Sequence, residues 1–137
     1  MNRLMAIDYG EKRIGIALSD PLKIFAKPFK VLDNKGKKKF LADLKVLISE
    51  QCVSEIILGY PIGESGQVTK KTLEIIELHK FLLNNLDLKI TLHDERFSTV
   101  DANNELKRLG YNYMEAKKVI DMVAASLILK SFMEGLN

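Results

Sequence analysis

The sequence of 137 residues predicts an α/β fold in which a five-stranded mixed sheet is flanked by helices. The apolar run 4–7 has no polar face, as in a strand that is covered on both sides. Residues 10–13 form a predicted turn, after which Ile14, Ile16 and Leu18 alternate with small residues as a returning strand. Further along the chain, short apolar strands alternate with amphipathic helices, which is typical of parallel strands joined by crossovers.

The composition limits the class of protein. We expect one domain over residues 1–137, because 47% apolar and 28% charged residues are ordinary for a globular protein of this length. No apolar run approaches the roughly 18 residues of a membrane span, and the lone Cys52 fits a reducing cytosol. The net charge of +3 leans weakly towards a polyanionic partner. We therefore expect a cytoplasmic protein without a membrane segment.

The first three strands are predicted to form an antiparallel meander. Residues 24–32 favour the third strand, and Pro28 places it at the sheet edge, where a missing N–H faces solvent. The lysine run 37–39 leads into a helix with apolar residues at helical spacing: Phe40, Leu44, Leu47 and Ile48. We interpret the lysines as a solvated helix end, with a phosphate contact as the alternative.

Two further strands are predicted, each after a helix. Residues 55–59 form a short apolar strand, and the glycine-containing loop 60–66 follows it at the edge where open α/β sheets bind ligands. Residues 89–93 alternate as the fifth strand. The helix between them, over about 68–86, has one predicted apolar face: Thr72, Ile75, Ile76, His79, Leu82 and Leu83. We interpret His79 as a core histidine with a hydrogen-bond partner rather than as a metal ligand.

The last third of the chain predicts two helices. Ser98 or Thr99 caps the first helix, and Gly110 ends it as a residue just past the C-terminus. The second helix covers about 114–134, and Asp121 interrupts its apolar stripe beside two alanines. The small alanine side chains permit a close approach of this helix to the sheet.

Three acids occupy positions where apolar residues would be expected: Asp8, Glu95 and Asp121. If the strands of Asp8 and Glu95 are parallel, both acids project from the same sheet edge. Converging carboxylates repel one another, and divalent cations remove that repulsion. An all-oxygen set suits Mg²⁺ or Mn²⁺, and two such ions about 4 Å apart can catalyse phosphoryl transfer. The alternatives are a turn-capping role for Asp8 and three dispersed surface charges.

Four motifs extend this hypothesis. They are Ala6–Gly10 with Lys12–Ala17, Ile57–Pro61 followed by Gly66, Asp94–Thr99, and Lys118, Asp121, Ala124, Ala125, Ile128 and Leu129. In this order, and over almost the whole chain, they resemble the YqgF family of bacterial ribonuclease H-like proteins. That family is described as Holliday junction resolvases and as pre-16S rRNA nucleases. The loop 62–65 departs from the family pattern, which is richer in Asn or Asp there, so its contacts are not carried over.

The resemblance implies a ribonuclease H-like sheet of strand order 3-2-1-4-5 and metal ligation by Asp8, Glu95 and Asp121. The sequence pattern leaves Asp94 and Glu95 open as the inward-facing acid, because successive strand residues alternate faces. We choose Glu95.

Further side chains around this centre are predicted to contact nucleic acid: Lys12, Arg13, Arg96, Thr99 and Lys118. Arg96 suits bidentate contact with a phosphate, although an ion pair with Asp94 is an equal alternative. A solvated turn is the alternative for Lys12 and Arg13, and a helix cap is the alternative for Thr99.

We therefore expect a metal-dependent nuclease that acts on structured nucleic acid. The resemblance implies that it processes the 5′ end of precursor 16S rRNA in ribosome biogenesis, with the small ribosomal subunit as a further partner. The alternatives are a Holliday junction resolvase and a nucleic-acid-binding module of the same fold that cleaves little. An actin-like ATPase is disfavoured because 137 residues cannot supply its two domains. Both a monomer and a homodimer remain open.

Overall fold

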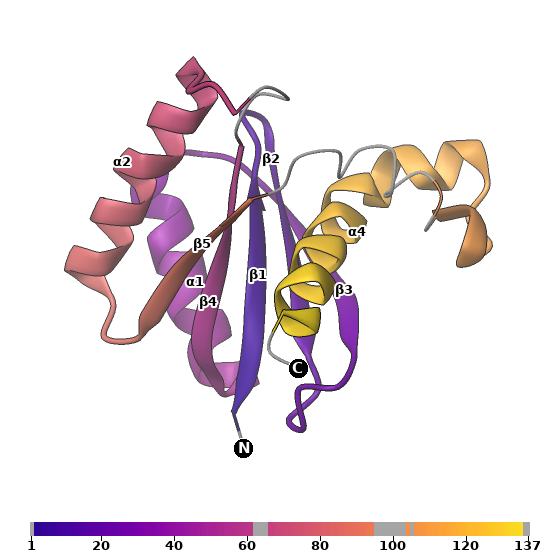
Figure 1. The fold of residues 1–137 in the computed structure, drawn as a ribbon, viewed down its shortest axis with the longest axis horizontal. Coiled ribbons are helices and arrows are strands. Elements are labelled where there is room, and N and C mark those ends of the chain that lie inside the picture. Colours follow the sequence, from indigo (N-terminus) through magenta and orange to yellow (C-terminus); the bar gives the residue numbers. More distant parts are fainter. Residues whose placement is uncertain (1, 62–65, 95–103, 105, 136–137) are drawn as a thin grey trace.

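The computed structural model describes residues 2–61, 66–94, 104 and 106–135, and within helix α4 it describes no side chains for residues 113–118. The elements lie along the chain in one order (Figure 1): β1 (Arg3–Tyr9), β2 (Arg13–Ser19), β3 (Ala26–Asp33), α1 (Lys37–Gln51), β4 (Val53–Tyr60), α2 (Lys70–Asn85), β5 (Lys89–Asp94) and α4 (Tyr113–Glu134).

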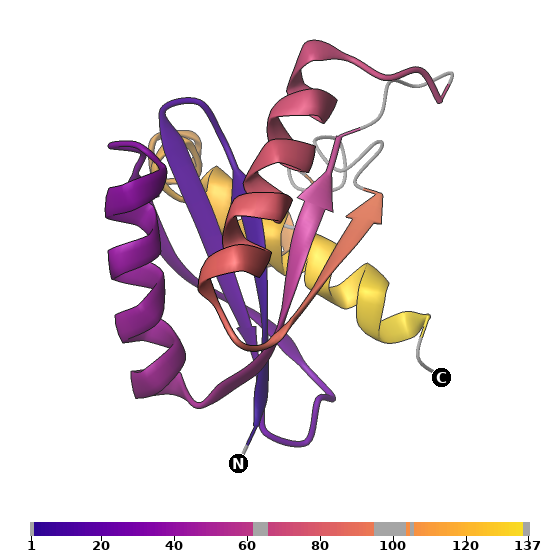
Figure 2. The same cartoon turned by 90° about the vertical axis from the view of Figure 1, so that its left-hand side faces the viewer.

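The five strands form one mixed sheet of order β3-β2-β1-β4-β5, which confirms the predicted fold and strand order. β1 pairs antiparallel with β2 and parallel with β4, so Ile7 lies between Ile16 and Leu58 at the centre of the sheet. β3 is an edge strand, as Pro28 predicts. Helices α1 and α2 cover one face of the sheet, and α4 covers the other (Figures 1 and 2).

Side chains of β1 alternate between two apolar clusters. Met5 and Ile7 pack with α1 and α2, whereas Leu4 and Ala6 pack with α4. Both faces of this strand are therefore buried, which explains why its sequence has no polar side. The same alternation decides which face each polar residue at the strand ends occupies.

Helix α2 begins at a capping box. The Thr69 hydroxyl accepts a hydrogen bond from the Thr72 backbone, and the Thr72 hydroxyl accepts one from the Thr69 backbone. The Thr72 hydroxyl also donates to the carbonyl of Pro61 and so ties the helix to the end of β4. His79 Nε2 lies 2.8 Å from the carbonyl oxygen of Ile90, in agreement with a satisfied core histidine.

The predicted apolar face of α2 is wrong at one position. Leu83 is 47% exposed, whereas Leu78, absent from the prediction, is 1% exposed. The helix turns the face that contains Ile75, Leu78 and Leu82 towards the sheet, which leaves Leu83 at its margin.

Residues 106–108 form a helical turn, and Gly110 follows it with a φ of +86°. The Tyr111 N–H donates to the Leu106 carbonyl, and the Gly110 N–H donates to the Lys107 carbonyl, which is a Schellman motif. The predicted helix end at Gly110 is confirmed, and the predicted cap at Ser98 or Thr99 lies outside the described residues. Within the described part of the chain, no helix has the length and apolar character needed to cross a membrane.

Candidate active site

Asp8 lies on the α4 face of the sheet, near the C-terminal end of β1. It follows Leu4 and Ala6 in the alternation of that strand, and both of these pack against α4. Asp8 is half-buried, and its partner in the antiparallel ladder with β2 is Gly15. The carboxylate therefore stands beside a position that has no side chain.

Helix α4 crosses the sheet at Gly15. A Cβ built on Gly15 would collide with the backbone carbonyl of Asp121 and would lie 2.8 Å from the backbone nitrogen of Met122. Glycine at this position thus permits direct contact between the backbones of β2 and α4. Because Gly15 pairs with Asp8, the crossing brings Asp8 and Asp121 to the same region of the same face.

Asp121 forms an ion pair with Arg13. The Arg13 Nε lies 2.9 Å from Asp121 Oδ2, and the two side chains are 52% and 22% exposed. The hydrogen bond to Asp121 and the charge of that carboxylate raise the pKa of the Arg13 guanidinium, with a smaller contribution from Asp33. The guanidinium is therefore cationic, and it occupies one of the carboxylate oxygens that the sequence assigns to a metal.

A hydrogen-bonded turn positions Arg13 at the start of β2. The Gly10 N–H donates to the Arg13 carbonyl over 2.9 Å, and a Cβ on Gly10 would collide with that oxygen. Asn34 holds the turn from the end of β3, since its Nδ2 donates to the Gly10 carbonyl over 2.8 Å and its backbone N–H donates to the Lys12 carbonyl over 2.8 Å. Lys12 is exposed at the tip of the turn.

The remaining predicted residues are less completely described. Glu95, Arg96 and Thr99 lie outside the described residues, as does the side chain of Lys118. Asp94 is described: it ends β5 opposite Tyr60, which packs against the cluster on the α1 and α2 face. Side chains two residues apart in a strand share one face of the sheet, so Asp94 lies on the same face as Ile90 and Leu92. Asp8 and Asp121 lie on the opposite face.

Two polar contacts of α4 are absent from the sequence prediction. His93 Nε2 lies 2.9 Å from the Ser131 hydroxyl, and the His93 ring makes an edge contact with Phe132 at 5.8 Å between centroids. These contacts join β5 to α4. The other is the Arg13–Asp121 pair, for which the only sequence signal is that both residues belong to the predicted site.

The described residues supply hard oxygen donors at this edge, from Asp8 and Asp121, and such donors suit Mg²⁺ or Mn²⁺. No three His, Cys, Asp or Glu side chains among the described residues are arranged to hold a metal ion. The third acid of the predicted set, Glu95, falls in the part of the chain that the structure does not describe.

The chain resembles known proteins along its full described length. A family model described as "RuvX: Holliday junction resolvase" matches residues 2–135. A protein of Maridesulfovibrio salexigens is 35% identical over 131 residues, which cover 96% of this chain and 97% of that protein. A protein of Dictyoglomus turgidum is 38% identical over 135 residues, which cover 98% and 96%. Both carry the name "Putative pre-16S rRNA nuclease".

Solved structures share the fold at much lower identity. The Fowlpox virus resolvase, solved with Holliday junction DNA, matches 98% of this chain and 98% of its own with a TM-score of 0.60 at 15% identity. RuvC of T. thermophilus, also solved with a Holliday junction, covers 100% of this chain with a TM-score of 0.55 at 8% identity. The fold is thus the ribonuclease H-like fold of these resolvases. Since the family model and the full-length relatives agree, the chain belongs to the RuvX family, which is the YqgF family that its motifs resemble.

Proposed function

We propose that this protein is a divalent-metal-dependent nuclease that hydrolyses phosphodiester bonds in structured nucleic acid. One observation carries the proposal: two carboxylates from distant parts of the chain, Asp8 and Asp121, share one face of the sheet because α4 contacts the backbone of Gly15. Apolar residues would be more stable at such half-buried positions, so a chemical role explains the acids better than packing does. Membership of the RuvX family supports the same activity.

Asp8, Glu95 and Asp121 would hold Mg²⁺ or Mn²⁺, with two ions as the expected number. The parity of Asp94 in β5 supports Glu95 as the third ligand, because Asp94 shares its face with Leu92 rather than with Asp8. When bound, such ions lower the pKa of water and stabilise the negative charge that develops on a phosphoryl group. Hydrolysis adds water across the P–O3′ bond and leaves a 5′-phosphate and a 3′-hydroxyl.

Arg13 has two roles in this proposal. Without a metal, its guanidinium balances the charge of Asp121 at 2.9 Å. When a cation takes over that carboxylate, the guanidinium is available for a bidentate contact with a phosphate at the same edge. Further phosphate contacts are assigned to the cations and the hydroxyl that the sequence places around this centre: Lys12, Arg96, Thr99 and Lys118.

The substrate that the relatives favour is the 5′ end region of precursor 16S rRNA, since the two relatives described above are named for that activity. A four-way DNA junction is the second candidate, because the family model and the Fowlpox virus resolvase are both described by junction resolution. A role in ribosome biogenesis places the protein in the cytoplasm, with the small ribosomal subunit as a partner, and it leaves a monomer and a homodimer as alternatives.

The test is a cleavage assay with Mg²⁺ or Mn²⁺ on precursor rRNA fragments and four-way DNA junctions side by side. Wild type should cut the rRNA at a defined site, and Asp8→Asn should bind it without cutting. Asp43→Asn is the matched control, since it removes a carboxylate that is 32% exposed and paired with Lys39 on α1. Preferential junction cleavage would favour the resolvase function, and binding to both substrates without cleavage of either would favour the non-catalytic module.

A further inference from the structure

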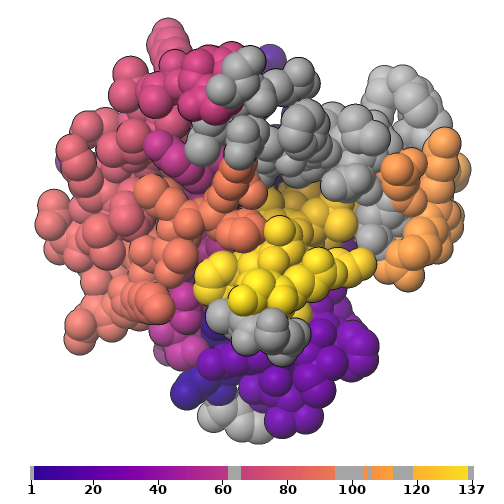
Figure 3. Space-filling model, in the orientation of Figure 1, coloured from indigo at the N-terminus to yellow at the C-terminus, as the bar shows by residue number. Residues whose placement is uncertain are grey.

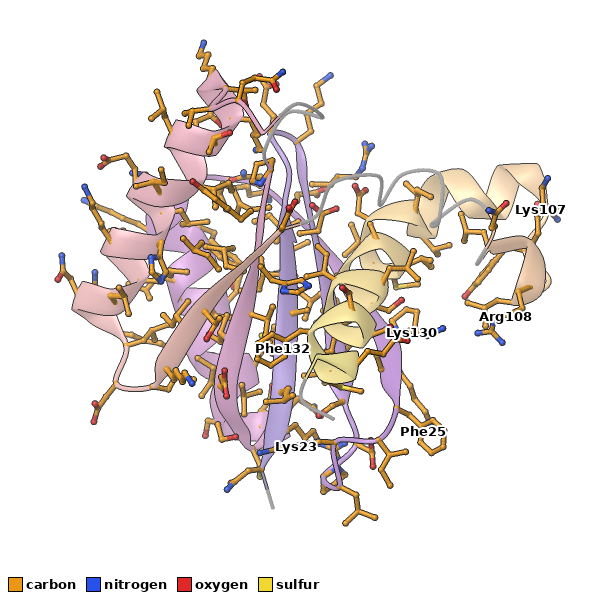
Figure 4. All side chains as sticks on the ribbon, viewed as in Figure 1. Lys23, Phe25, Lys107, Arg108, Lys130 and Phe132 are labelled. Carbon is orange, nitrogen blue, oxygen red and sulfur yellow. The ribbon has the colours of Figure 1, made fainter. Side chains whose placement is uncertain are left out.

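The loop between β2 and β3 exposes apolar side chains next to α4. Leu22 is 77% exposed, Ile24 59% and Phe25 63%. Phe25 extends away from the edge of the sheet in Figure 4, on the side where Arg108 and Lys130 also lie. An aromatic ring exposed to this extent is unfavourable in water, so a ligand that covers it would gain the burial of its surface.

The loop holds Phe25 in a defined position. The Asp20 carboxylate accepts hydrogen bonds from three backbone N–H groups, those of Phe25 at 2.7 Å, Ile24 at 2.8 Å and Leu22 at 3.2 Å. The Asp20 N–H donates in return to the Phe25 carbonyl over 3.3 Å, and Lys23 adopts φ +58° at the loop tip. Because the backbone is ordered before any ligand arrives, binding at Phe25 loses little conformational entropy.

Phe25 borders a groove of about 360 Å³ between the start of β3, α4 and the end of helical residues 106–108. Ser126, Leu127 and Met133 of α4 contribute to its wall. Two cations also line it, Arg108 from the 106–108 segment and Lys130 from α4. Lys27 borders the groove through its backbone, since it pairs with Leu18 and so directs its side chain to the α1 and α2 face. None of its lining residues within the described part of the chain is acidic. Figure 4 shows the Lys130 side chain extending from α4 towards the segment that carries Arg108.

An exposed aromatic ring among cations suits a single-stranded nucleic acid. Unpaired bases stack on aromatic side chains, and the cations follow the phosphates. A duplex does not present its base faces to Phe25, because they are stacked inside the helix. A second copy of this chain would bring Arg108 and Lys130 towards the same cations of its partner, which like-charge repulsion disfavours. The charge and the ring together favour an unpaired strand.

The groove lies within reach of the candidate active site. α4 runs along this side of the molecule with β3 beside it in the space-filling view (Figure 3). Lys130 follows Asp121 by nine residues on α4, so the two positions are about 13 Å apart along the helix axis at ~1.5 Å per residue. At an axial rise of ~3.4 Å per nucleotide along one stacked strand, this distance corresponds to about four nucleotides.

We propose that a single-stranded segment of the substrate binds in this groove, with a base stacked on Phe25 and its phosphates bound by Arg108 and Lys130. The inference rests on the proposed nuclease function and specifies it further: the substrate has an unpaired segment about four nucleotides from the cleavage site. A paired or blunt-ended substrate would leave the groove empty.

Tryptophan fluorescence tests the stacking directly. The sequence contains no tryptophan, so Phe25→Trp introduces a single reporter that keeps an aromatic face. Binding of a short single-stranded RNA, in EDTA so that no cleavage occurs, should quench this emission. An equal concentration of the same sequence as a blunt duplex should quench it much less.

Affinity measurements on labelled single-stranded RNA give the second readout. Phe25→Ala should weaken binding by about 5- to 150-fold, the loss typical of one stacked base. Leu22→Ala is the matched control, since Leu22 belongs to the same loop and is more exposed but does not line the groove. Lys130→Glu should weaken binding and flatten its salt dependence. Lys45→Glu, an exposed lysine of α1 on the opposite face of the sheet, should not.

Four results would overturn the inference. Equal affinities of wild type, Phe25→Ala and Leu22→Ala would place the strand elsewhere. Quenching of Phe25→Trp by polyglutamate but not by RNA would assign the groove to an acidic protein segment. Dissociation of a dimer by Phe25→Ala, seen by light scattering, would make this face an interface between copies. Quenching by the duplex that equals quenching by the single strand would remove the need for unpaired bases.

The two proposals can fail separately. If no substrate is cut but RNA quenches Phe25→Trp, the nuclease function fails and the binding groove stands. If wild type cuts precursor rRNA and Phe25→Ala binds and cuts it equally well, the groove fails and the nuclease function stands.

Discussion

Gly15 of β2 and Asp121 of α4 are in backbone contact, and no side chain larger than hydrogen fits between them. The contact fixes the depth at which α4 lies on the sheet. It therefore also fixes the position of the Asp121 carboxylate relative to Asp8, which pairs with Gly15 in the neighbouring strand.

Gly15→Ala should destabilise the protein and reduce its activity together. The new methyl group meets the backbone of α4, which cannot change rotamer, so the helix must move away from the sheet. Overpacking of this kind costs about 1–3 kcal/mol of unfolding free energy. Urea unfolding measures the loss, and Gly135→Ala is the control, because a Cβ there lies 3.4 Å from the nearest atom, the Phe132 carbonyl oxygen. Equal stability of the two variants would contradict the close contact.

Arg13→Gln should strengthen metal binding and weaken nucleic-acid binding. Arg13 competes with a cation for Asp121, so its removal should lower, severalfold, the Mn²⁺ concentration that gives half of the maximal thermal stabilisation. The loss of one phosphate contact should reduce the log–log salt slope of RNA binding by about one. Lys39→Gln breaks an ion pair of the same 2.9 Å length on α1 and should change neither quantity. An unaltered metal response in Arg13→Gln would separate Asp121 from the metal.

Asp121→Asn should abolish cleavage while the protein stays folded. Its ion pair with Arg13 is half exposed on the arginine side, and pairs of this kind contribute little to stability. In EDTA the variant should therefore melt close to the wild type, and added Mg²⁺ should stabilise it less. Cleavage should fall by more than about 100-fold, beyond the loss typical of residues that only support a metal ligand. A variant that melts early in EDTA and still cleaves would make Asp121 a structural residue.

The loop that carries Phe25 should lose its order in acid. Hydrogen bonds from Phe25, and then from Ile24 and Leu22, lower the pKa of Asp20 below its ordinary value of 3.8. A folded-state pKa below the unfolded one contributes stability above pH 3.8, and this contribution is lost as the pH falls through the folded value. Once the loop opens, the protection factors of the Ile24 and Phe25 backbone amides, which correct for the intrinsic exchange rate at each pH, should fall. In Asp20→Asn, the same two amides should exchange faster than in the wild type at pH 6. Their protection should then fall less on acidification than it does in the wild type.

The sequence predicts the sheet well, because its signals are local. The apolar run 4–7 indicates a strand buried on both faces, and Pro28 indicates an edge, and the structure has both. The predicted end of a helix at Gly110 is equally local, since the left-handed φ and the Schellman hydrogen bonds involve only neighbouring residues. The helix face is less predictable: Leu78 and Leu83 lie less than two turns apart on α2, and the spacing of apolar residues alone does not show which one faces the sheet.

The candidate site is only partly predictable for a different reason. Asp8 and Asp121 stand out as acids in apolar surroundings, but the Arg13–Asp121 pair joins residues 108 positions apart and depends on how α4 crosses β2. No local pattern contains that crossing angle. The choice between Asp94 and Glu95 likewise depends on which of the two faces the same side of the sheet as Asp8. The pairing of Tyr60 with Asp94 between β4 and β5 provides that information.

The position of α4 along the chain has a consequence for synthesis. All five strands precede α4 in the sequence, so during translation the sheet is made before the helix that carries Asp121. A nascent chain that has folded its strands still lacks one acid of the candidate site, and contacts between elements this distant in sequence form late. Under the proposed function, the growing polypeptide would therefore emerge from the ribosome without cutting activity, and it would gain the capacity to cleave only when α4 docks on Gly15.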